Sequence, residues 1–532
     1  MVVIGAGIAG LTAAVCLAER GVSVTVLEAQ RVCGGRVQTD GTTAVTFGGQ
    51  TWQFPDEHGI HGVWSQYHNF RSMLKRVRQE GALIPAQGQE WVHGNRTSLH
   101  RLEVGRILTR SALPAPFHYV PLVFQMGFLR LLRPWDVLRL PFALAGLIVA
   151  ASMDPMRDID LLKGKSLTLL LEGWPPPLRH LFSALARNGL SADPEAVGLG
   201  DFVAWLRFYT FLRRDAWGFH FFRADPGSTL IEPMLTALRE AHGRVLVDCR
   251  AIRLQRVQAD LWHVEYEALG VEDPRGDGVL LGTDAMGGET YQDAPLRRLT
   301  PVRGVRLARN VVLALDAPGS RSLLTGTGSS TEADARLMEW PTAQATVVVR
   351  FWFSVLPVIT AEAGVLSGDF SADNFFWLQN FHDGAYLWHR ATGGSAIELH
   401  VYGPPALLAR DDADILRLTL GDVERLYPDV RGTCVQHMLR RNPPVHTLYR
   451  TGTGEGNLAV VAPWAGIVCC GDWIRHDTPS LFLERACITG IAAANVVLAE
   501  RGLEPYVIQR EQAPEGVAHW LERILYFVRR WT

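Results

Sequence analysis

Residues 1–28 read MVVIGAGIAGLTAAVCLAERGVSVTVLE, and this stretch decides the fold of the first part of the chain. An apolar strand is followed by the pattern G-x-G-x-x-G at Gly5, Gly7 and Gly10, by a helix, and by a second apolar strand that ends at Glu28. In this context the three glycines give a tight turn, room for a pyrophosphate and close packing of helix on strand. The helix N-terminus favours a phosphate, and the acid can accept hydrogen bonds from a ribose 2′-OH. The stretch therefore predicts a dinucleotide-binding βαβ unit.

The composition limits the class of protein. The chain has 532 residues, 48% of them hydrophobic, so two lobes with sizeable cores are expected. A net charge of −2 gives no indication of a nucleic-acid partner. The seven cysteines are odd in number and contain no C-x-x-C pair, which favours buried free thiols in a reducing compartment over disulfides or a metal site. Since the first strand begins at Met1, no signal peptide is expected, although a few native residues before it could be missing.

A second glycine-rich turn follows the βαβ unit. Residues 29–37 read AQRVCGGRV, so Gly35 can let the backbone fold over the dinucleotide while Arg36 faces a phosphate. The same residues could form an ordinary surface turn, but their position directly after Glu28 favours the cofactor. Next come FGGQ at residues 47–50 and EHGIH at residues 57–61, and the latter is followed by Tyr67 and Asn69.

These motifs resemble the FAD-binding segment of the superfamily that includes amine oxidases, protoporphyrinogen oxidase and carotenoid desaturases. The spacing E-x-G-x-H, then Tyr67 and Asn69, is similar to the corresponding stretch of phytoene and zeta-carotene desaturases. The run VVLALDAP at residues 311–318 resembles the same group. In this family the acid of the second strand binds the FAD ribose and the G-G-R turn contacts the cofactor, so the resemblance implies those roles for Glu28 and Arg36.

Two later motifs extend the resemblance towards the C-terminus. Residues 226–249 read PGSTLIEPMLTALREAHGRVLVDC, which is similar to the family's P-G-G, helix, G-x-V unit except that Ser228 replaces the second glycine. That unit lays its backbone on the FAD adenine, which implies a main-chain contact from Cys249. Residues 466–490 read GIVCCGDWIRHDTPSLFLERACITG and resemble the block that closes over the ribityl-diphosphate and the flavin ring. The fingerprint and the resemblance together assign to FAD the residues Gly5, Gly7, Ile8, Ala9, Gly10, Glu28, Ala29, Gly35, Arg36, Gly48, Gly49, Cys249, Gly471, Asp472 and Ala486.

Residues 102–153 differ in character from the cofactor motifs. Their longest uncharged run, residues 140–153, has 14 residues and is shorter than the roughly 20 that a spanning helix needs. Arginines punctuate this oily segment and also the amphipathic tail at residues 515–530. Arginines beside aromatic and leucine faces favour helices that lie in a membrane interface, and a purely helical substrate lobe is the alternative. We therefore expect peripheral (monotopic) association with the cytoplasmic side of a membrane.

The remaining periodicity predicts an α/β fold with two lobes. Strands are expected at residues 261–267, 309–318, 346–353, 384–388, 395–402 and 438–440, a helix at 411–426, and a long loop at 270–301. The expected first lobe is a discontinuous Rossmann-type FAD-binding domain formed by residues 1–101, 223–330 and 455–500. The second, a substrate and membrane-associating lobe with a mixed sheet and helices, comprises residues 102–222 and 331–454. Residues 501–532 form an amphipathic tail.

The resemblance implies an FAD-dependent oxidoreductase acting on a long apolar isoprenoid, as in carotenoid desaturation. FAD would accept a hydride from an allylic carbon, a neighbouring carbon would lose a proton, and a quinone or oxygen would reoxidise the flavin. End-ring desaturation with a methyl shift, isomerisation and dehydroxylation occur in related branches and stay open. An oxidase of a smaller polar substrate is another alternative, but the family's amine oxidases set a lysine near the flavin and this chain has none after Lys165. A flavoprotein that binds lipid without redox chemistry is the third.

The sequence offers no clear acid or base for catalysis. His61 and Glu57 of the E-x-G-x-H block are the first candidates, followed by Asp383 and His389. His61 could equally be a core histidine with a backbone partner. No metal is expected.

Overall fold

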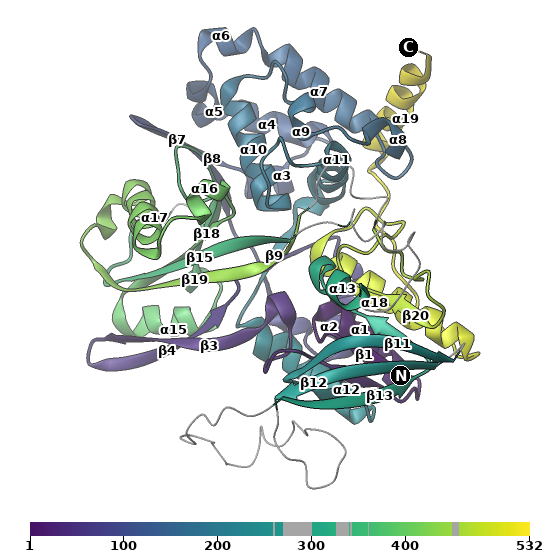
Figure 1. Ribbon diagram of the computed structural model, residues 1–532. Coiled ribbons are helices and arrows are strands. Elements are labelled where there is room, and N and C mark those ends of the chain that lie inside the picture. The colour runs from purple at the N-terminus through teal and green to yellow at the C-terminus, as the bar shows by residue number, and fades with distance from the viewer. Residues whose placement is uncertain are drawn as a thin grey trace.

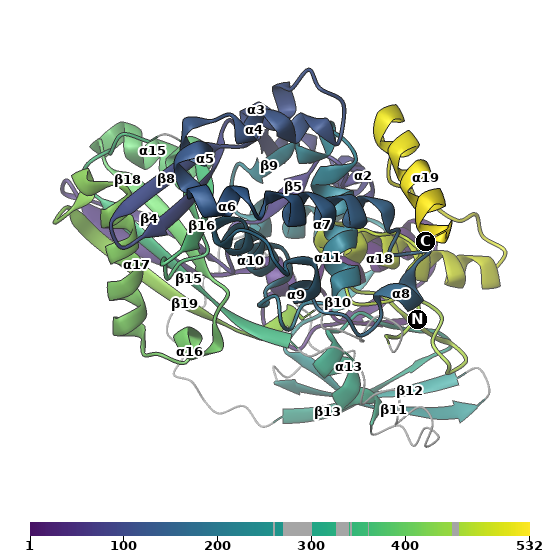
Figure 2. The same cartoon turned by 90° about the horizontal axis from the view of Figure 1, so that it is seen from above.

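The computed structural model describes residues 1–258, 261–269, 301–325, 340, 343–359, 361–448 and 457–531. Figures 1 and 2 show two sheet regions joined by a group of helices that lies over both. The predicted α/β class is confirmed: a parallel Rossmann-type sheet lies beside a larger mixed sheet. Most of the predicted loop at residues 270–301 lies outside the described residues.

A five-stranded parallel sheet forms the core of the first region. Its strands in spatial order are β10 (Arg244–Leu246), β2 (Thr25–Leu27), β1 (Val2–Ile4), β14 (Val311–Leu313) and β20 (Ile467–Cys469). These strands are apolar and almost all buried, as expected for a parallel sheet covered on both faces. The chain thus contributes five separate strands to this sheet, and the first and last predicted cofactor motifs meet at its carboxyl edge.

Helices and a three-stranded antiparallel sheet flank the parallel sheet. The helices α1 (Ile8–Glu19), α12 (Glu232–Glu240) and α18 (Phe482–Glu500) are in contact, with α1 packed between the other two. The antiparallel strands are β11 (Cys249–Gln258), β12 (Leu261–Leu269) and β13 (Pro301–Ala308). After β14 the chain forms the helix α13 (Ala317–Leu324). Asp316 is its N-cap residue, and the Asp316 side chain accepts a hydrogen bond from the Gly319 N–H.

The second region is built on a seven-stranded mixed sheet. Its strands in spatial order are β19 (Cys434–Thr447), β15 (Ala343–Phe353), β18 (Ser395–Val401), β17 (Asn374–Trp377), β16 (Ala363–Gly368), β7 (Gln89–Asn95) and β8 (Ser98–Glu103). The amphipathic helix α17 (Asp412–Leu426) packs against it, as predicted. Because β7 and β8 pair with β16, the boundary expected at residue 101 cuts through this sheet, and the second region takes part of the first 101 residues.

The strands predicted for this region are found only in part. Residues 395–401 and 438–440 do lie in strands, and residue 402 follows the first of them. Residues 384–388 were expected to form a strand, but they belong to the helix α15 (Asp383–Thr392), so this prediction is wrong. The buried residues Ala385 and Trp388 lie three positions apart, which is a helical spacing, but a segment of five residues is too short to tell this spacing from that of a strand.

Two small antiparallel sheets and a short helix join the regions. The hairpin of β3 (Thr39–Phe47) and β4 (Gln50–Glu57) leads into β5 (Gly62–Trp64) and the helix α2 (His68–Arg76). β5 pairs with β9 (Phe219–Phe222), which also pairs with β6 (Leu83–Pro85). The E-x-G-x-H block therefore crosses from one region to the other.

Helices form a third layer, seen at the top of Figure 1. They are α3 (Gly105–Arg110), α4 (Val120–Val123), α5 (Met126–Leu131), α6 (Pro134–Val137), α7 (Leu140–Ser152), α8 (Ile159–Leu162), α9 (Leu167–Leu170), α10 (Pro176–Leu190) and α11 (Leu199–Leu206). The C-terminal helix α19 (Gly516–Trp531) packs against α7. Ion pairs from Arg207 to Glu522 and from Arg529 to Asp158, at 2.6 and 2.8 Å, attach α19 to the layer.

Two described helices are long and apolar enough to cross a membrane by length and composition alone. One is α18, which is mostly buried against α1 and is a core helix. The other is Pro134–Ser152, which comprises α6 and α7 and is longer than the 14-residue run expected from the sequence. Only 28% of it is buried, so it lies largely at the surface.

Candidate functional site

A cavity of about 1520 Å³ connects all three layers. It begins at the carboxyl edge of the parallel sheet, passes the end of the mixed sheet and extends among the helices. At the sheet edge it is lined by the backbone of the glycine motifs, and elsewhere mainly by aliphatic and aromatic side chains. The geometry of each end follows from the residues that form it.

The glycine fingerprint forms the first wall of the cavity. At Gly10 a Cβ atom would lie 2.0 Å from the carbonyl oxygen of Gly5, so this position accepts no larger residue without displacing the strand–helix turn. At Gly7, by contrast, a Cβ atom would meet nothing within 4 Å, because this residue faces the cavity. Ile8 and Ala9, in the first turn of α1, line the same wall. The helix N-terminus thus opens onto a space into which a phosphate can approach the backbone.

Glu28 lies beside this turn with both carboxylate oxygens fixed. Its Oε2 accepts a hydrogen bond from the Ala6 N–H at 2.7 Å, and its Oε1 accepts one from the Gln30 N–H at 2.9 Å. Burial raises the pKa of Glu28 above its usual value, although these N–H groups oppose the shift. The side chain lines the cavity next to Ala29, at the position where a ribose hydroxyl would be bound.

The G-G-R turn connects the first motif to the last. Gly34 pairs with Gly7 in a parallel bridge, and Gly35 and Arg36 line the cavity. The Arg36 guanidinium lies 2.7 Å from a carboxylate oxygen of Asp472, which is almost fully buried. The same oxygen accepts a hydrogen bond from Thr447 at the end of β19. Segments more than 400 residues apart are therefore joined at one point of the cavity wall.

The helix α18 closes this end of the cavity. Its Thr489 hydroxyl hydrogen-bonds the Gly471 backbone, accepting from the N–H at 2.9 Å, and Ala486 lines the wall one turn earlier. Glu484 accepts hydrogen bonds from the backbone N–H groups of Asn69 and Phe70, each at 2.9 Å. The C-terminal motif at residues 466–490 and the segment that contains Tyr67 and Asn69 thus bind each other through Glu484. Thr489 was not predicted, and no pattern in the sequence marks it.

Eleven of the fifteen residues assigned to FAD line the cavity, and four do not. Those that do are Gly5, Gly7, Ile8, Ala9, Glu28, Ala29, Gly35, Arg36, Gly471, Asp472 and Ala486. Gly10 supports the turn from behind. Gly48 and Gly49 join β3 to β4 outside the cavity, so the tight turn of the hairpin accounts for these two glycines. Cys249 is buried, and its N–H donates to the Glu28 carbonyl, so that donor is already used; its neighbour Arg250 lines the cavity instead.

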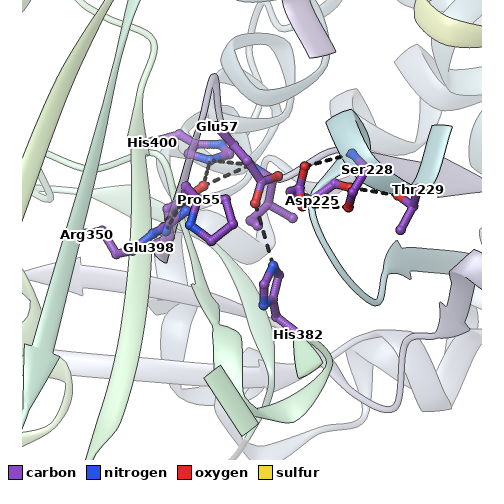
Figure 3. A network of polar contacts seen from close by, with 10 residues as sticks. Pro55, Glu57, Asp225, Ser228, Thr229, Arg350, His382, Glu398 and His400 are labelled. Carbon is purple, nitrogen blue, oxygen red and sulfur yellow. Dashed lines mark hydrogen bonds and ion pairs between the residues drawn. The ribbon is translucent and has the colours of Figure 1, made fainter. Parts of the chain in front are cut away.

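The candidate catalytic residues are dispersed. His61 lines the cavity. Its burial, and to a smaller extent the nearby His58 and His400, lower the pKa of His61 to about 3. Glu57 is buried outside the cavity lining; burial raises its pKa to about 8, and its nearest histidine, His382 at 3.7 Å, has a pKa lowered to about 4. This contact, drawn in Figure 3, therefore joins two neutral groups near neutral pH. Asp383, paired with the Arg223 guanidinium at 3.3 Å, and His389 lie on α15 away from the cavity, so neither reaches the site.

The far part of the cavity is oily. Its walls come from α4, α6, α7, α10, α11 and α19, and representative lining residues are Phe117, Val120, Val137, Leu140, Leu147, Leu178, Phe182, Leu185, Trp205 and Leu525. A small polar group interrupts it where the mixed sheet ends, with His400, Tyr402, Asn374 and His446. The cavity can therefore hold a long apolar molecule with one polar stretch near the glycine motifs. Among the described residues no group of three or more His, Cys, Asp or Glu side chains is placed to hold a metal.

Comparisons with known proteins agree with this architecture. Residues 3–77 match the family model for NAD(P)-binding Rossmann-like domains, and residues 198–498 match the model for flavin-containing amine oxidoreductases. A carotenoid phi-ring synthase from Streptomyces griseus is 29% identical over 524 residues, covering 94% of this chain and 88% of the relative. One from Chlorobaculum tepidum is 22% identical, with 94% and 89% covered. The fold of cyclohexylamine oxidase from Brevibacterium oxydans aligns with a TM-score of 0.63 at 14% identity, covering 94% and 98% of the two chains.

The wall that faces the glycine motifs fits FAD. It offers an uncovered helix N-terminus, a glycine whose Cβ position is open, and a fixed carboxylate at the ribose position. When bound there, FAD supplies the oxidising equivalent for hydride removal. The second family model covers more than half of the chain, from before the third strand of the parallel sheet to the end of α18. The chain belongs to the flavin-containing amine oxidoreductase family and is an FAD-dependent oxidoreductase.

Proposed function

We propose that this enzyme oxidises a carotenoid, and specifically that it desaturates an end ring with a shift of a ring methyl group. The observation that carries this proposal is that one cavity joins the predicted FAD wall to a large apolar compartment among the helices, called the apolar tunnel below. A carotenoid is a long hydrocarbon, and its burial is favoured by roughly 25 cal/mol for each Å² of apolar surface removed from water. A polar amine would gain little from such walls.

The curated relatives support the ring chemistry. The two relatives that align over 94% of this chain are carotenoid phi-ring synthases, and a zeta-carotene desaturase from Arabidopsis thaliana is 30% identical over 162 residues, 30% of this chain and 26% of the relative. The length of the alignment to the two synthases, 94% of this chain, favours ring modification over simple chain desaturation. In this proposal the eleven motif residues that line the cavity hold FAD, and the helical layer holds the polyene.

We further propose that the substrate enters from a membrane surface on the helical layer. Around α4 to α7 and α19 many apolar side chains are exposed, among them Phe124 at 72%, Trp135 at 74%, Leu138 at 75% and Trp520 at 62%. Val120, Val137 and Leu144 belong both to this exposed face and to the cavity lining, so the cavity reaches this face. Arg130, Arg133 and Arg139 are exposed beside it and suit anionic lipid headgroups.

The test uses the purified holoenzyme with liposomes that contain β-carotene, lycopene or phytoene, followed by chromatography and mass spectrometry of the pigments. We expect β-carotene to be converted to a product that has lost an even number of hydrogen atoms, with a quinone or oxygen supplied as acceptor. A product of unchanged mass would indicate isomerisation instead. Peroxide release from small amines, with all three polyenes unchanged, would overturn the proposal.

A further inference from the structure

A series of hydrogen-bonded side chains runs from the buried Glu398 through His400 and ends in the cavity at Tyr402. His400 is next to last in β18 and Tyr402 follows the strand, so their side chains leave the sheet on the same face. The Tyr402 hydroxyl lies 2.8 Å from Nδ1 of His400, and both side chains line the cavity. Phe376 packs on His400, with ring centres 5.1 Å apart, and keeps the imidazole in place.

Glu398, two residues before His400, is the far end of this series and is fully buried. Figure 3 shows it between His400 and Arg350. Its Oε1 lies 2.8 Å from Nε2 of His400, and its Oε2 accepts two hydrogen bonds from Arg350, at 2.6 and 3.0 Å. Burial would raise the pKa of Glu398, but the charge of Arg350 and the His400 contact outweigh it and lower the pKa to about 2. Glu398 is therefore an ionised carboxylate.

These contacts fix the tautomer of His400. The carboxylate can only accept, so Nε2 carries the proton and Nδ1 is left as an acceptor for the Tyr402 hydroxyl. The Ile60 N–H approaches both Glu398 Oε1, at 2.8 Å, and Nε2, at 3.2 Å, and the closer, charged acceptor takes it. A hydroxyl that donates to a histidine held by a buried carboxylate has the arrangement of a general-base triad.

The hydrogen-bonded series of Glu398, His400 and Tyr402 lies close to the predicted flavin wall. The ring of His446 stands between Tyr402 and Phe482, at centroid distances of 6.5 and 6.1 Å. The next residue, Thr447, hydrogen-bonds Asp472 of the G-D motif. Tyr402 thus lies between the cofactor motifs and the apolar tunnel, where the reacting end of a long substrate would be.

We propose that Tyr402, His400 and Glu398 form a proton relay that removes a proton from carbon during substrate oxidation. Tyr402 is the catalytic residue because it faces the substrate, and His400 and Glu398 are positioning residues that act through it. The inference rests on the proposed oxidation of a carotenoid ring. It assigns the proton step to residues that lie more than 300 positions from the E-x-G-x-H block.

The oxidation removes a hydride from one carbon of the substrate and a proton from its neighbour. Bound FAD would supply the two-electron oxidant that takes a hydride, a proton with two electrons, from one carbon of the substrate, which would leave a carbocation on the substrate. At a neighbouring carbon a C–H bond breaks, its electron pair forms the new double bond, and its proton goes to the Tyr402 oxygen. The phenol proton moves at the same time to Nδ1 of His400, and the imidazolium is stabilised by Glu398. Burial raises the pKa of Tyr402 well above its usual value, so a standing phenolate is disfavoured and the coupled transfer is needed.

The test compares Y402F and H400A with the wild-type holoenzyme. Y402F keeps the ring but removes the relay hydroxyl, so we expect kcat to fall about 100-fold or more with KM within about threefold. H400A should lose activity similarly and recover at least about tenfold when imidazole is added, which a purely structural residue would not do. The double variant should be no slower than the slower single variant, since members of one relay are not additive.

Y506F is the matched control, because it removes a tyrosine hydroxyl that donates to Glu19 at 3.0 Å outside the cavity. It should stay within about twofold of wild type. Polyene binding, followed by its absorption shift, and the melting temperature should be unchanged in Y402F. Turnover of Y402F within threefold of wild type, or loss of H400A activity that imidazole does not restore, would overturn the relay. If the wild-type enzyme fails to oxidise any carotenoid, the proposed function fails first.

Discussion

The two ends of the cavity are built from different parts of the chain. The FAD end is formed around the backbone of the glycine motifs and a helix N-terminus, with the charged side chains of Glu28, Arg36 and Asp472 beside them. At the substrate end the wall is almost entirely side chains from short helices. A backbone wall constrains the sequence tightly, because only certain residues permit its geometry. A side-chain wall can be remade by substitution, which is why a common fold can serve different substrates.

The largest effects are expected at Gly10 and Gly7, two positions of the backbone wall. G10A places a Cβ atom 2.0 Å from the Gly5 carbonyl, so we expect apoenzyme stability to fall by about 3 kcal/mol and flavin to be lost. G7A places its Cβ atom in the open cavity, so its apoenzyme should unfold like wild type while FAD affinity falls at least about tenfold. Denaturant unfolding and flavin titration separate the two. Equal unfolding of both variants would show that Gly10 is not a packing position.

The next prediction breaks the side-chain wall alone. Leu185 of α10 lines the cavity, so L185E buries a carboxylate in the apolar tunnel, and carotenoid oxidation should fall about 100-fold at unchanged flavin content. R179E changes an exposed side chain of the same helix and is the control, with activity expected within about twofold. Product chromatography and flavin absorbance measure both. Loss of flavin in L185E would mean that the two ends are not separable.

The success of prediction from sequence follows the same division. The backbone wall was predictable because G-x-G-x-x-G in its strand–helix context, the G-G-R turn and the G-D motif each have a local geometric cause. Gly48, Gly49 and Cys249 were assigned by resemblance, and the structure gives the first two to a hairpin turn and engages the N–H of the third with Glu28. No local pattern marks the Glu398, His400 and Tyr402 chain, because its partners Arg350 and Ile60 come from other segments.

The same limit applies to the larger architecture. The helices and strands with strong periodicity, such as α17 and β18, were predictable from the sequence. The pairing of β7 with β16 was not, because it joins segments about 270 residues apart and depends on no local signal. The E-x-G-x-H motif likewise gives no sign that the Glu57 side chain is buried outside the cavity lining.

A smaller effect is expected at the entrance to the side-chain wall. Leu138 is 75% exposed on the helical layer, and Leu307 is 62% exposed on β13 of the three-stranded antiparallel sheet. L138S should weaken binding to anionic liposomes about tenfold, since a leucine buried in the interface contributes about 1.5 kcal/mol. L307S should have no effect. Flotation of each variant with vesicles measures binding, and equal binding of L138S and wild type would contradict the proposed membrane face.

The last effect is on the pH dependence of stability and concerns Glu57, the buried acid between the two regions. The pKa of Glu57 is raised to about 8, chiefly by burial, so the folded state holds a proton that the unfolded state has released above its ordinary pKa. Stability therefore falls as pH rises through this window. E57Q should lessen the fall by about 1 kcal/mol for each pH unit between about pH 5 and about pH 8 in denaturant titrations. D383N alters an exposed acid and should leave the fall unchanged. If the free energy of unfolding of E57Q depended on pH as it does in the wild type, a group other than Glu57 would be responsible for the fall.

The most direct test of the central claim, that one cavity brings an apolar polyene to FAD, is anaerobic mixing of the oxidised holoenzyme with β-carotene in liposomes. Flavin absorbance is followed by stopped flow, with L185E and Y506F alongside and small amines as rival reductants. The account predicts that β-carotene bleaches the flavin of wild type and Y506F, that L185E bleaches about 100-fold more slowly, and that amines have no effect. Bleaching by an amine, with none by β-carotene or the other polyenes, would contradict it.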